Sequence, residues 1–128
     1  MNMPRVLIVD DNLMNLELVS FLLQADGIEV VSVPDAHSAL RDIRTFQPEL
    51  ILMDIQLPDI DGLTLTRQIK ADPSTRHMAV VAFTAYAMKD DKARMLEAGC
   101  DGYIAKPIEI GSFTTTIRNH LAKNRSQL

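Results

Sequence analysis

The chain has 128 residues, the size of one domain, and 47% of them are hydrophobic, enough for a core without disulfides or a structural metal. The formal net charge of −4 and the scattered lysines and arginines argue against nucleic-acid binding. One cysteine, Cys100, cannot form an intramolecular disulfide and suits a reducing compartment. The hydrophobic runs are too short for a membrane span or a signal peptide, so we expect a cytoplasmic protein that does not bind membranes.

Short hydrophobic runs alternate along the chain with longer segments of helical periodicity. The runs predict strands at residues 5–9, 28–33, 49–53, 78–84 and 102–106. The segments between them predict helices at residues 13–25, 62–71, 88–98 and 110–123, with one more that starts after Asp35 and ends before Pro48. Gly27 and Gly99 lie just past the ends of two of these helices and are typical stop signals.

Strands that alternate with helices indicate a parallel sheet with helices on both faces. The almost continuous hydrophobic character of the runs "VLIV", "LILM" and "AVVAF" is typical of strands buried on both sides. Right-handed crossovers leave few topologies. We therefore predict an α/β fold with a doubly wound five-stranded parallel sheet in the flavodoxin-like strand order 2-1-3-4-5.

Polar side chains follow four of the five predicted strands. Asp10 and Asp11 come after the first strand, and Asp54 comes after the third. Thr84 ends the fourth strand, and Lys106 ends the fifth. Because ligands of such sheets bind beyond the carboxyl ends of the strands, we expect these five side chains to form one site.

The chemistry of this side-chain set indicates phosphoryl transfer to an aspartate. Three neighbouring carboxylates repel one another unless a cation joins them, and a site of oxygen ligands favours Mg²⁺. Lys106 adds a compact positive charge, and Thr84 adds a hydroxyl group. A carboxylate such as Asp54 between a divalent cation and an ammonium group can act as the nucleophile.

These residues resemble the motifs of the response regulator receiver domains of two-component systems. The matching features are the acid pair Asp10-Asp11, Asp54 at the end of a hydrophobic strand, "LPDIDG", "FTA" and "AKP". Thr84 and Lys106 follow Asp54 at the intervals found in the family. The resemblance covers nearly the whole chain. The stretch "TAYAMKDDKARMLEAGCDGYIAKPIE" resembles receivers of single-domain type, such as the polar-differentiation regulators, and receivers of hybrid kinases.

The resemblance implies a role for each site residue. Asp54 would be the phosphoacceptor. Asp11 and Asp54 would bind Mg²⁺ directly, together with the backbone carbonyl of Gln56, and Asp10 would act on the metal through water or hydrogen bonds. Mn²⁺ is expected to substitute for Mg²⁺.

The remaining roles concern the phosphoryl group and the switch. Lys106 would bind the phosphoryl group, and the Lys106–Pro107 peptide bond would be cis, as is usual in the family. Thr84 and Tyr103 would form the switch pair: Thr84 moves toward the phosphoryl group, and Tyr103 turns inward.

Partners are implied in the same way. A histidine kinase or a histidine phosphotransfer protein would donate the phosphoryl group and dock on Leu13, Leu16, Pro107 and Ile108. We expect Leu13 and Leu16 to lie apart from the core-facing stripe of the first helix; alternatively, they pack under a neighbouring loop. The predicted core stripe of this helix consists of Leu18, Val19, Leu22 and Leu23.

We expect residues 1–128 to form a single receiver domain without an output domain, unless the chain is an excised part of a larger protein. It would then signal as a monomer, through contacts with a downstream protein effector. The protein would not be an enzyme beyond Mg²⁺-dependent self-phosphorylation and autodephosphorylation.

Other functions of this architecture fit the residues less well. A Mg²⁺-dependent phosphohydrolase with an aspartyl-phosphate intermediate needs a second acid two residues after the nucleophile, where this chain has Gln56. A flavin-binding electron carrier needs a phosphate-binding loop after the first strand, where the two acids would repel phosphate. A receiver that had lost phosphorylation would not keep the complete residue set. We interpret Asp59 and Asp61 as turn or capping residues rather than ligands.

Overall fold

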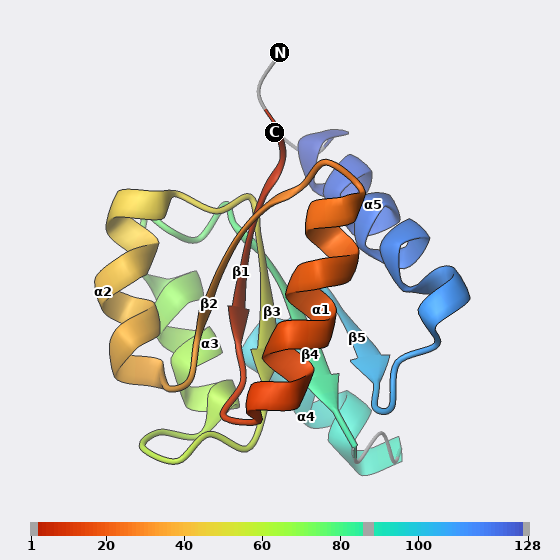
Figure 1. The fold of residues 1–128 in the computed structure, drawn as a ribbon. Helices are drawn as coiled ribbons and strands as arrows, with labels where there is room; N and C mark the ends of the chain where they lie inside the picture. The colour runs from red at the N-terminus through yellow and green to blue at the C-terminus, as the bar shows by residue number, and fades with distance from the viewer. Residues whose placement is uncertain (1–2, 86–88, 127–128) are drawn as a thin grey trace.

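The computed structural model describes residues 3–85 and 89–126, which form one parallel sheet between two layers of helices (Figure 1). The five strands are β1 (Arg5–Val9), β2 (Glu29–Val33), β3 (Leu50–Asp54), β4 (Ala79–Thr84) and β5 (Gly102–Ala105). They pair in the order β2-β1-β3-β4-β5, and every pairing is parallel. The predicted fold class and strand order are therefore confirmed.

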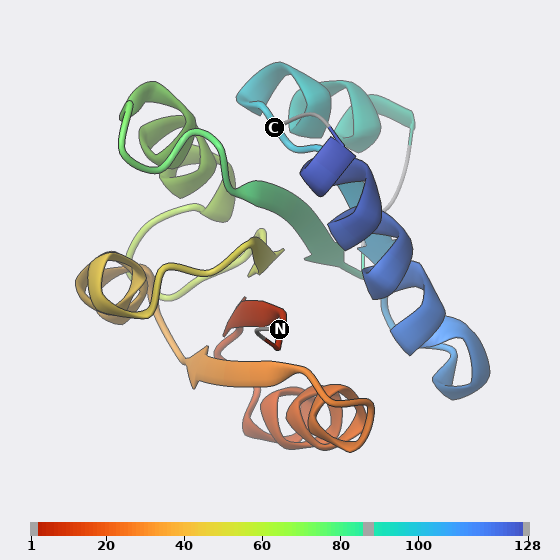
Figure 2. The ribbon, with the colours of Figure 1, turned by 90° about the horizontal axis from the view of Figure 1, so that it is seen from above.

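The helices are divided between the two faces of the sheet (Figure 2). α1 (Leu13–Ala25) and α5 (Ile110–Ser126) cover one face. α2 (Ala36–Phe46), α3 (Gly62–Ala71) and α4 (Lys89–Ala98) cover the other. No helix in the described part of the chain is long and apolar enough to cross a membrane.

The three central strands feed both hydrophobic cores because successive side chains of a strand point to opposite faces. In β3, Ile51 and Met53 pack in the core beneath α2, α3 and α4. Leu50 and Leu52 pack in the core beneath α1 and α5. All five residues of β3 are buried, including the acid that ends it. The strand that carries Asp54 is thus clamped from both sides.

Three helices begin at side chains that cap free backbone amides. Asn12 accepts a hydrogen bond from the amide of Asn15 at the start of α1, at 3.1 Å. Asp35 accepts one from Ser38 at 2.7 Å in α2. Asp61 accepts one from Leu63 at 2.8 Å in α3. Such caps satisfy amides that have no partner within the helix.

Several boundaries differ from the predictions by a few residues. Asp54 is the last residue of β3 rather than the first residue after it. α5 continues to Ser126, beyond the predicted end at residue 123. Met88, the predicted first residue of the fourth helix, lies outside the described residues.

The predicted core stripe of α1 is confirmed at Val19 and Leu23, and Leu22 is partly buried against the same core, but the stripe is wrong at Leu18, because the buried face is rotated slightly from the predicted one. The buried residues are Leu16, Val19 and Leu23, whereas Leu18 is 38% exposed. Hydrophobic residues occupy most of the circumference of "LMNLELVSFLLQA", so the periodicity does not specify which side faces the sheet. Packing against β1 and β2 decides it.

Candidate functional site

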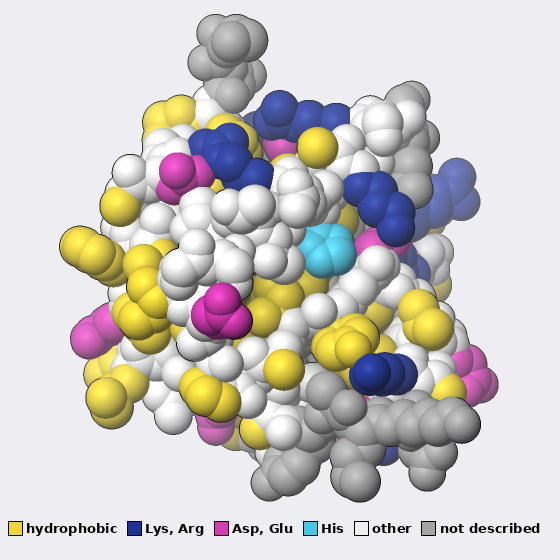
Figure 3. Space-filling model, turned by 90° about the vertical axis from the view of Figure 1, so that its right-hand side faces the viewer, with side chains coloured by type: hydrophobic (Ala, Val, Ile, Leu, Met, Phe, Trp, Pro, Cys, Tyr) yellow, Lys and Arg dark blue, Asp and Glu magenta, His cyan; other side chains and the backbone are white. Residues whose placement is uncertain are grey.

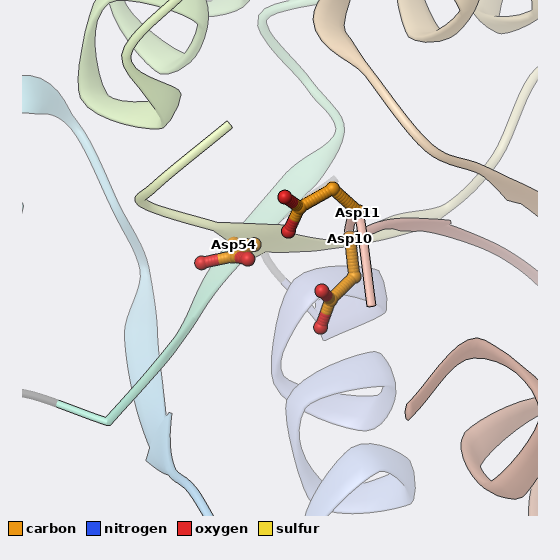
Figure 4. Close-up of side chains that lie close together, drawn as sticks. All are labelled: Asp10, Asp11 and Asp54. Atoms are coloured by element: carbon orange, nitrogen blue, oxygen red, sulfur yellow. The ribbon is translucent and has the colours of Figure 1, made fainter. Parts of the chain in front are cut away.

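Three carboxylates meet at the carboxyl edge of the sheet (Figure 4). One oxygen from each of Asp10, Asp11 and Asp54 lies within 4.8 Å of the others. The strand register explains this proximity, because Val9 in β1 pairs with Met53 in β3 and the acids follow directly. Asp10 is fully buried and Asp54 is 6% exposed, while Asp11 faces solvent. The predicted clustering of the three acids is confirmed.

Asp10 is held by the chain that follows it. Its Oδ1 accepts a hydrogen bond from the amide of Asn12 at 2.9 Å. Its Oδ2 accepts one from the Asn15 side-chain amide at 3.4 Å and forms an ion pair with Lys106 Nζ at 3.0 Å. These partners satisfy the hydrogen-bonding capacity of the buried carboxylate and fix the orientation of its oxygens.

Lys106 reaches the acids from the end of β5. Its Nζ lies 3.3 Å from Asp54 Oδ2, in addition to the contact with Asp10. The same ammonium lies 4.8 Å from the centroid of the Phe83 ring, a cation–π distance that the sequence did not lead us to expect. The Lys106–Pro107 peptide bond is cis, as the resemblance implied. The lysine is therefore positioned by two carboxylates and one aromatic face.

The electrostatics of the cluster favour binding of a cation. Burial raises the pKa of Asp54 to about 6, and the nearby charge of Asp10 also raises it. The Gln56 amide, which donates to Asp54 Oδ1 at 3.0 Å, and the ammonium of Lys106 act in the opposite direction. One ammonium does not balance three carboxylates. A hard divalent ion with oxygen ligands, above all Mg²⁺, fits this donor set.

The two predicted switch residues lie in different environments. Thr84 is 3% exposed at the end of β4, and its carbonyl accepts a hydrogen bond from the backbone amide of Lys106 at 2.8 Å. Tyr103 is 39% exposed on β5, with Lys92 Nζ 5.0 Å from its ring centroid. Thr84 thus adjoins the site, whereas the Tyr103 ring lies partly in solvent.

The predicted docking residues are only partly at the surface. Leu13 is 68% exposed directly beyond the acid pair, Pro107 is exposed and Ile108 is half-buried. Leu16 is 7% exposed and packs in the core, so its prediction as a docking residue is wrong. The reason is that the buried face of α1 differs slightly from the predicted one and includes Leu16, which packs toward the sheet.

The opposite side of α1 carries an exposed hydrophobic stripe. Hydrophobic side chains gather on the left of Figure 3, the side on which α1 lies. On α1 they are Leu13, Met14, Leu18 and Phe21, of which Met14 is 80% exposed and Phe21 is 68% exposed. We did not expect Met14, Leu18 and Phe21 at the surface from the sequence. The spacing of Met14, Leu18 and Phe21 places them on one helical face, but it does not show that this face is the exposed one, because α1 is hydrophobic over most of its circumference.

The loop acids do not belong to the carboxylate cluster. Asp61 caps α3, as expected of a capping residue. Asp59 also caps a helix, but that helix is α2, whose amides at Ala36 and His37 donate to the two Asp59 oxygens at 3.0 Å each. The partner of Asp59 lies more than 20 residues away in the chain. Local sequence patterns carry no signal for such a contact.

Comparison with known proteins identifies the family. A family model described as "Response regulator receiver domain" matches residues 6–118. The polar-differentiation response regulator DivK of Brucella anthropi is 44% identical over 120 residues, which cover 93% of this chain and 98% of that protein. DivK of Brucella suis biovar 1 is also 44% identical, over 116 residues that cover 91% of this chain and 94% of that protein.

Solved structures agree with this result. A CheY-like receiver domain protein from Methanospirillum hungatei superposes with a TM-score of 0.90 and is 29% identical, with 99% of this chain and all of that chain covered. The receiver domain of a sensor histidine kinase from Pseudomonas aeruginosa has a TM-score of 0.85 and 30% identity, with 94% of this chain and 99% of that chain covered. That structure has a magnesium ion coordinated in its active site cleft. The present chain belongs to the response regulator receiver domain family, whose members are phosphorylation-dependent signalling switches of two-component systems.

Proposed function

We propose that Asp54 accepts a phosphoryl group from a phosphohistidine and that this modification switches the domain. The observation that carries the proposal is the position of the Asp54 carboxylate, at a buried strand end between two further acids and the ammonium of Lys106. Clamped on both faces of the sheet, β3 presents this carboxylate at a fixed point, as in-line attack on phosphorus requires.

The transfer exchanges one bond for another. An oxygen of Asp54 forms a bond to phosphorus while the bond between phosphorus and the donor's imidazole nitrogen breaks. The imidazole takes up a proton from water. The phosphoryl oxygens then replace the Asp10 and Asp54 carboxylates as partners of Lys106 Nζ, which now lies 3.0 and 3.3 Å from those carboxylates. Lys106 thus already stands where the new negative charge arrives.

Four groups of the chain would hold the metal ion. The proposed direct ligands are Asp11, Asp54 and the backbone carbonyl of Gln56, and Asp10 would act through water or hydrogen bonds. Mg²⁺, when bound, neutralises negative charge that develops on the phosphoryl oxygens. Mn²⁺ accepts the same oxygen ligands and is expected to replace it. In the same site, small phosphodonors would support self-phosphorylation, and water would support autodephosphorylation.

Thr84 and Tyr103 would transmit the change. Thr84 lies at the end of β4 beside the site, so its hydroxyl can turn toward a phosphoryl oxygen. Tyr103 on β5 then turns inward from its half-exposed position beneath Lys92. The surface around β5 changes shape, and a downstream protein effector recognises it.

The phosphodonor protein would dock beside the acids. A phosphohistidine has to reach Asp54 past the residues that border the site, and Leu13 and Pro107 are exposed there. The exposed stripe Leu13, Met14, Leu18 and Phe21 continues this surface along α1. A helix with an apolar face, from a histidine kinase or a histidine phosphotransfer protein, fits such a stripe.

A labelling experiment tests the proposal. The purified protein is incubated with acetyl phosphate and Mg²⁺, and its intact mass is measured. We expect one phosphoryl group per chain, removed by base and absent when EDTA replaces Mg²⁺. Asp54→Asn should not be labelled, whereas Asp61→Asn, a change of the same kind in the following loop, should be labelled like the parent. Equal labelling of Asp54→Asn and the parent would refute the proposal.

The geometry does not favour the phosphohydrolase. That enzyme needs an acid two residues after its nucleophile. Here the position is occupied by Gln56, which is exposed and whose backbone N–H donates a hydrogen bond to Asp54 Oδ1.

A further inference from the structure

Asp59 joins the loop after β3 to a helix distant in the chain. The loop spans residues 55–61, between β3 and α3. Asp59 Oδ1 accepts a hydrogen bond from the amide of Ala36, and Asp59 Oδ2 accepts one from His37, each at 3.0 Å. These amides are the first two of α2. A third amide, that of Ile60 in the loop itself, donates to Oδ1 at 3.0 Å.

The start of α2 is therefore shared between two carboxylates. Its own cap, Asp35, takes the third amide, that of Ser38, at 2.7 Å. Together the two acids satisfy the first three amides of α2, which have no partners within the helix. The hydrogen bond from Ala36 is the main cause that lowers the pKa of Asp59, so the side chain is held as a carboxylate. Asp35 stabilises α2 locally, whereas Asp59 also ties a second segment to it.

The loop that Asp59 holds carries a proposed metal ligand. At its base, the Gly62 amide donates to the Ile55 carbonyl at 2.7 Å, and the Gln56 amide donates to Asp54 Oδ1 at 3.0 Å. Asp59 fastens the loop near its tip, three residues beyond Gln56. The backbone of Gln56, which would present its carbonyl to the ion, thus lies between a tie at the base and a tie at the tip.

We propose that Asp59 is a positioning residue for metal binding: by docking the β3–α3 loop on the N-terminus of α2, it holds the Gln56 carbonyl in place. The inference rests on the proposed function, in which that carbonyl is a ligand. A ligand on an untied loop loses more conformational freedom when it binds, so affinity falls when the tie is cut. Groups that orient metal ligands typically change affinity by about tenfold or more when they are removed.

The chain offers a matched pair of variants. Asp59→Ala and Asp35→Ala each remove one carboxylate from the start of α2, but only Asp59→Ala releases the loop. Mg²⁺ is titrated into the unphosphorylated, ¹⁵N-labelled protein, and the dissociation constant is obtained from changes in the amide chemical shifts. We expect Asp59→Ala to weaken Mg²⁺ binding about tenfold. Asp35→Ala should stay within about twofold of the parent.

A second measurement, amide hydrogen exchange, reports on the mobility of the loop itself. Amide hydrogen exchange should accelerate at Gln56 in Asp59→Ala but not in Asp35→Ala, because only the first change removes the tie at the loop tip. If either alanine variant fails to fold, Asp59→Asn and Asp35→Asn replace the pair. Asp59→Asn keeps one carbonyl acceptor and should show an intermediate loss of affinity.

The outcomes separate the two proposals. If the parent binds Mg²⁺ and Asp59→Ala binds it as tightly as Asp35→Ala, the positioning role is wrong while the proposed site stands. If the parent itself shows no Mg²⁺-dependent shifts at millimolar concentrations, the metal site of the proposed function is wrong. If Asp59→Ala alone weakens binding and loosens the loop, the positioning role is supported.

Discussion

Replacing Asp54 by asparagine should stabilise the metal-free protein, although it removes the proposed phosphoacceptor. Asp54 is buried beside Asp10, and burial is the main cause that raises its pKa to about 6. A raised pKa means that the ionised carboxylate is less stable in the folded chain than in the unfolded chain. Asparagine has nearly the same shape and no charge, so Asp54→Asn removes this cost.

The magnitude follows from the pKa. A rise from 3.8 to about 6 corresponds to about 3 kcal/mol near pH 7, at about 1.4 kcal/mol per pKa unit. Water reaches the open edge of the site and screens the charges, so we expect a gain of about 2 kcal/mol in the free energy of unfolding. The raised pKa already includes the attraction between Asp54 and Lys106, so the loss of this ion pair needs no further deduction, and Asp10 keeps the lysine paired in the variant.

The gain should depend on pH with a definite sign. Between pH 3.8 and about 6 the folded chain binds more protons at Asp54 than the unfolded chain does, so the stability of the parent falls as the pH rises through this window. Above it the full cost of the charge is present. The advantage of Asp54→Asn is therefore largest near neutral pH and disappears as the pH falls toward 4.

The assay is urea unfolding in EDTA, followed by circular dichroism, for the parent, Asp54→Asn and Asp61→Asn. Asp61→Asn is the control, because asparagine caps a helix about as well as aspartate does. Added Mg²⁺ should stabilise the parent and narrow the difference. If Asp54→Asn is less stable than the parent near pH 7 in EDTA, or if its advantage grows toward pH 4, the reasoning is refuted.

Three further changes test other contacts. Phe83→Leu should slow phosphorylation by acetyl phosphate about fivefold, because it removes the aromatic ring that contacts Lys106 Nζ. Phe113→Leu is the control and should leave the rate unchanged, because its ring, with a centroid 6.4 Å from that of Phe83, belongs to the core. Gly102→Ala would put a methyl group 2.5 Å from Cε1 of His120 and push the imidazole ring toward solvent. Burial is the main cause that lowers the pKa of His120, so this pKa should rise toward 6.5 in an NMR titration of the variant. An unchanged pKa would contradict the packing of His120 against Gly102. Phe21→Ser should change the free energy of unfolding by less than about 0.5 kcal/mol and slow phosphotransfer from a phosphohistidine protein but not from acetyl phosphate; equal rates would exclude this face of α1 as the docking surface.

Features that depend on local patterns were predictable from the sequence. Continuous hydrophobic runs marked β1, β3 and β4, because these strands are buried on both faces. Because ligands of parallel sheets bind beyond the carboxyl ends of the strands, the proximity of Asp10, Asp54 and Lys106 could be predicted from their positions at the strand ends.

Features that depend on how elements pack were not predictable. α1 is hydrophobic over most of its circumference, so Leu16 and Leu18 could not be assigned to the core or to the surface without the sheet beneath them. The contact of Asp59 with α2 joins distant segments, and its residue type also suits an ordinary turn. The ring of Phe83 beneath Lys106 depends on the side-chain conformation of a lysine, which no periodicity records.

The central claim is that Asp54 receives the phosphoryl group, and mapping the modified residue tests it most directly. The protein is phosphorylated with acetyl phosphate and Mg²⁺, reduced with borohydride to convert aspartyl phosphate to homoserine, and digested for mass spectrometry. We predict homoserine at position 54 and unmodified aspartate at positions 10 and 11. Homoserine at either of those two positions, or a phosphoryl group retained on a histidine with residue 54 unchanged, would contradict the account.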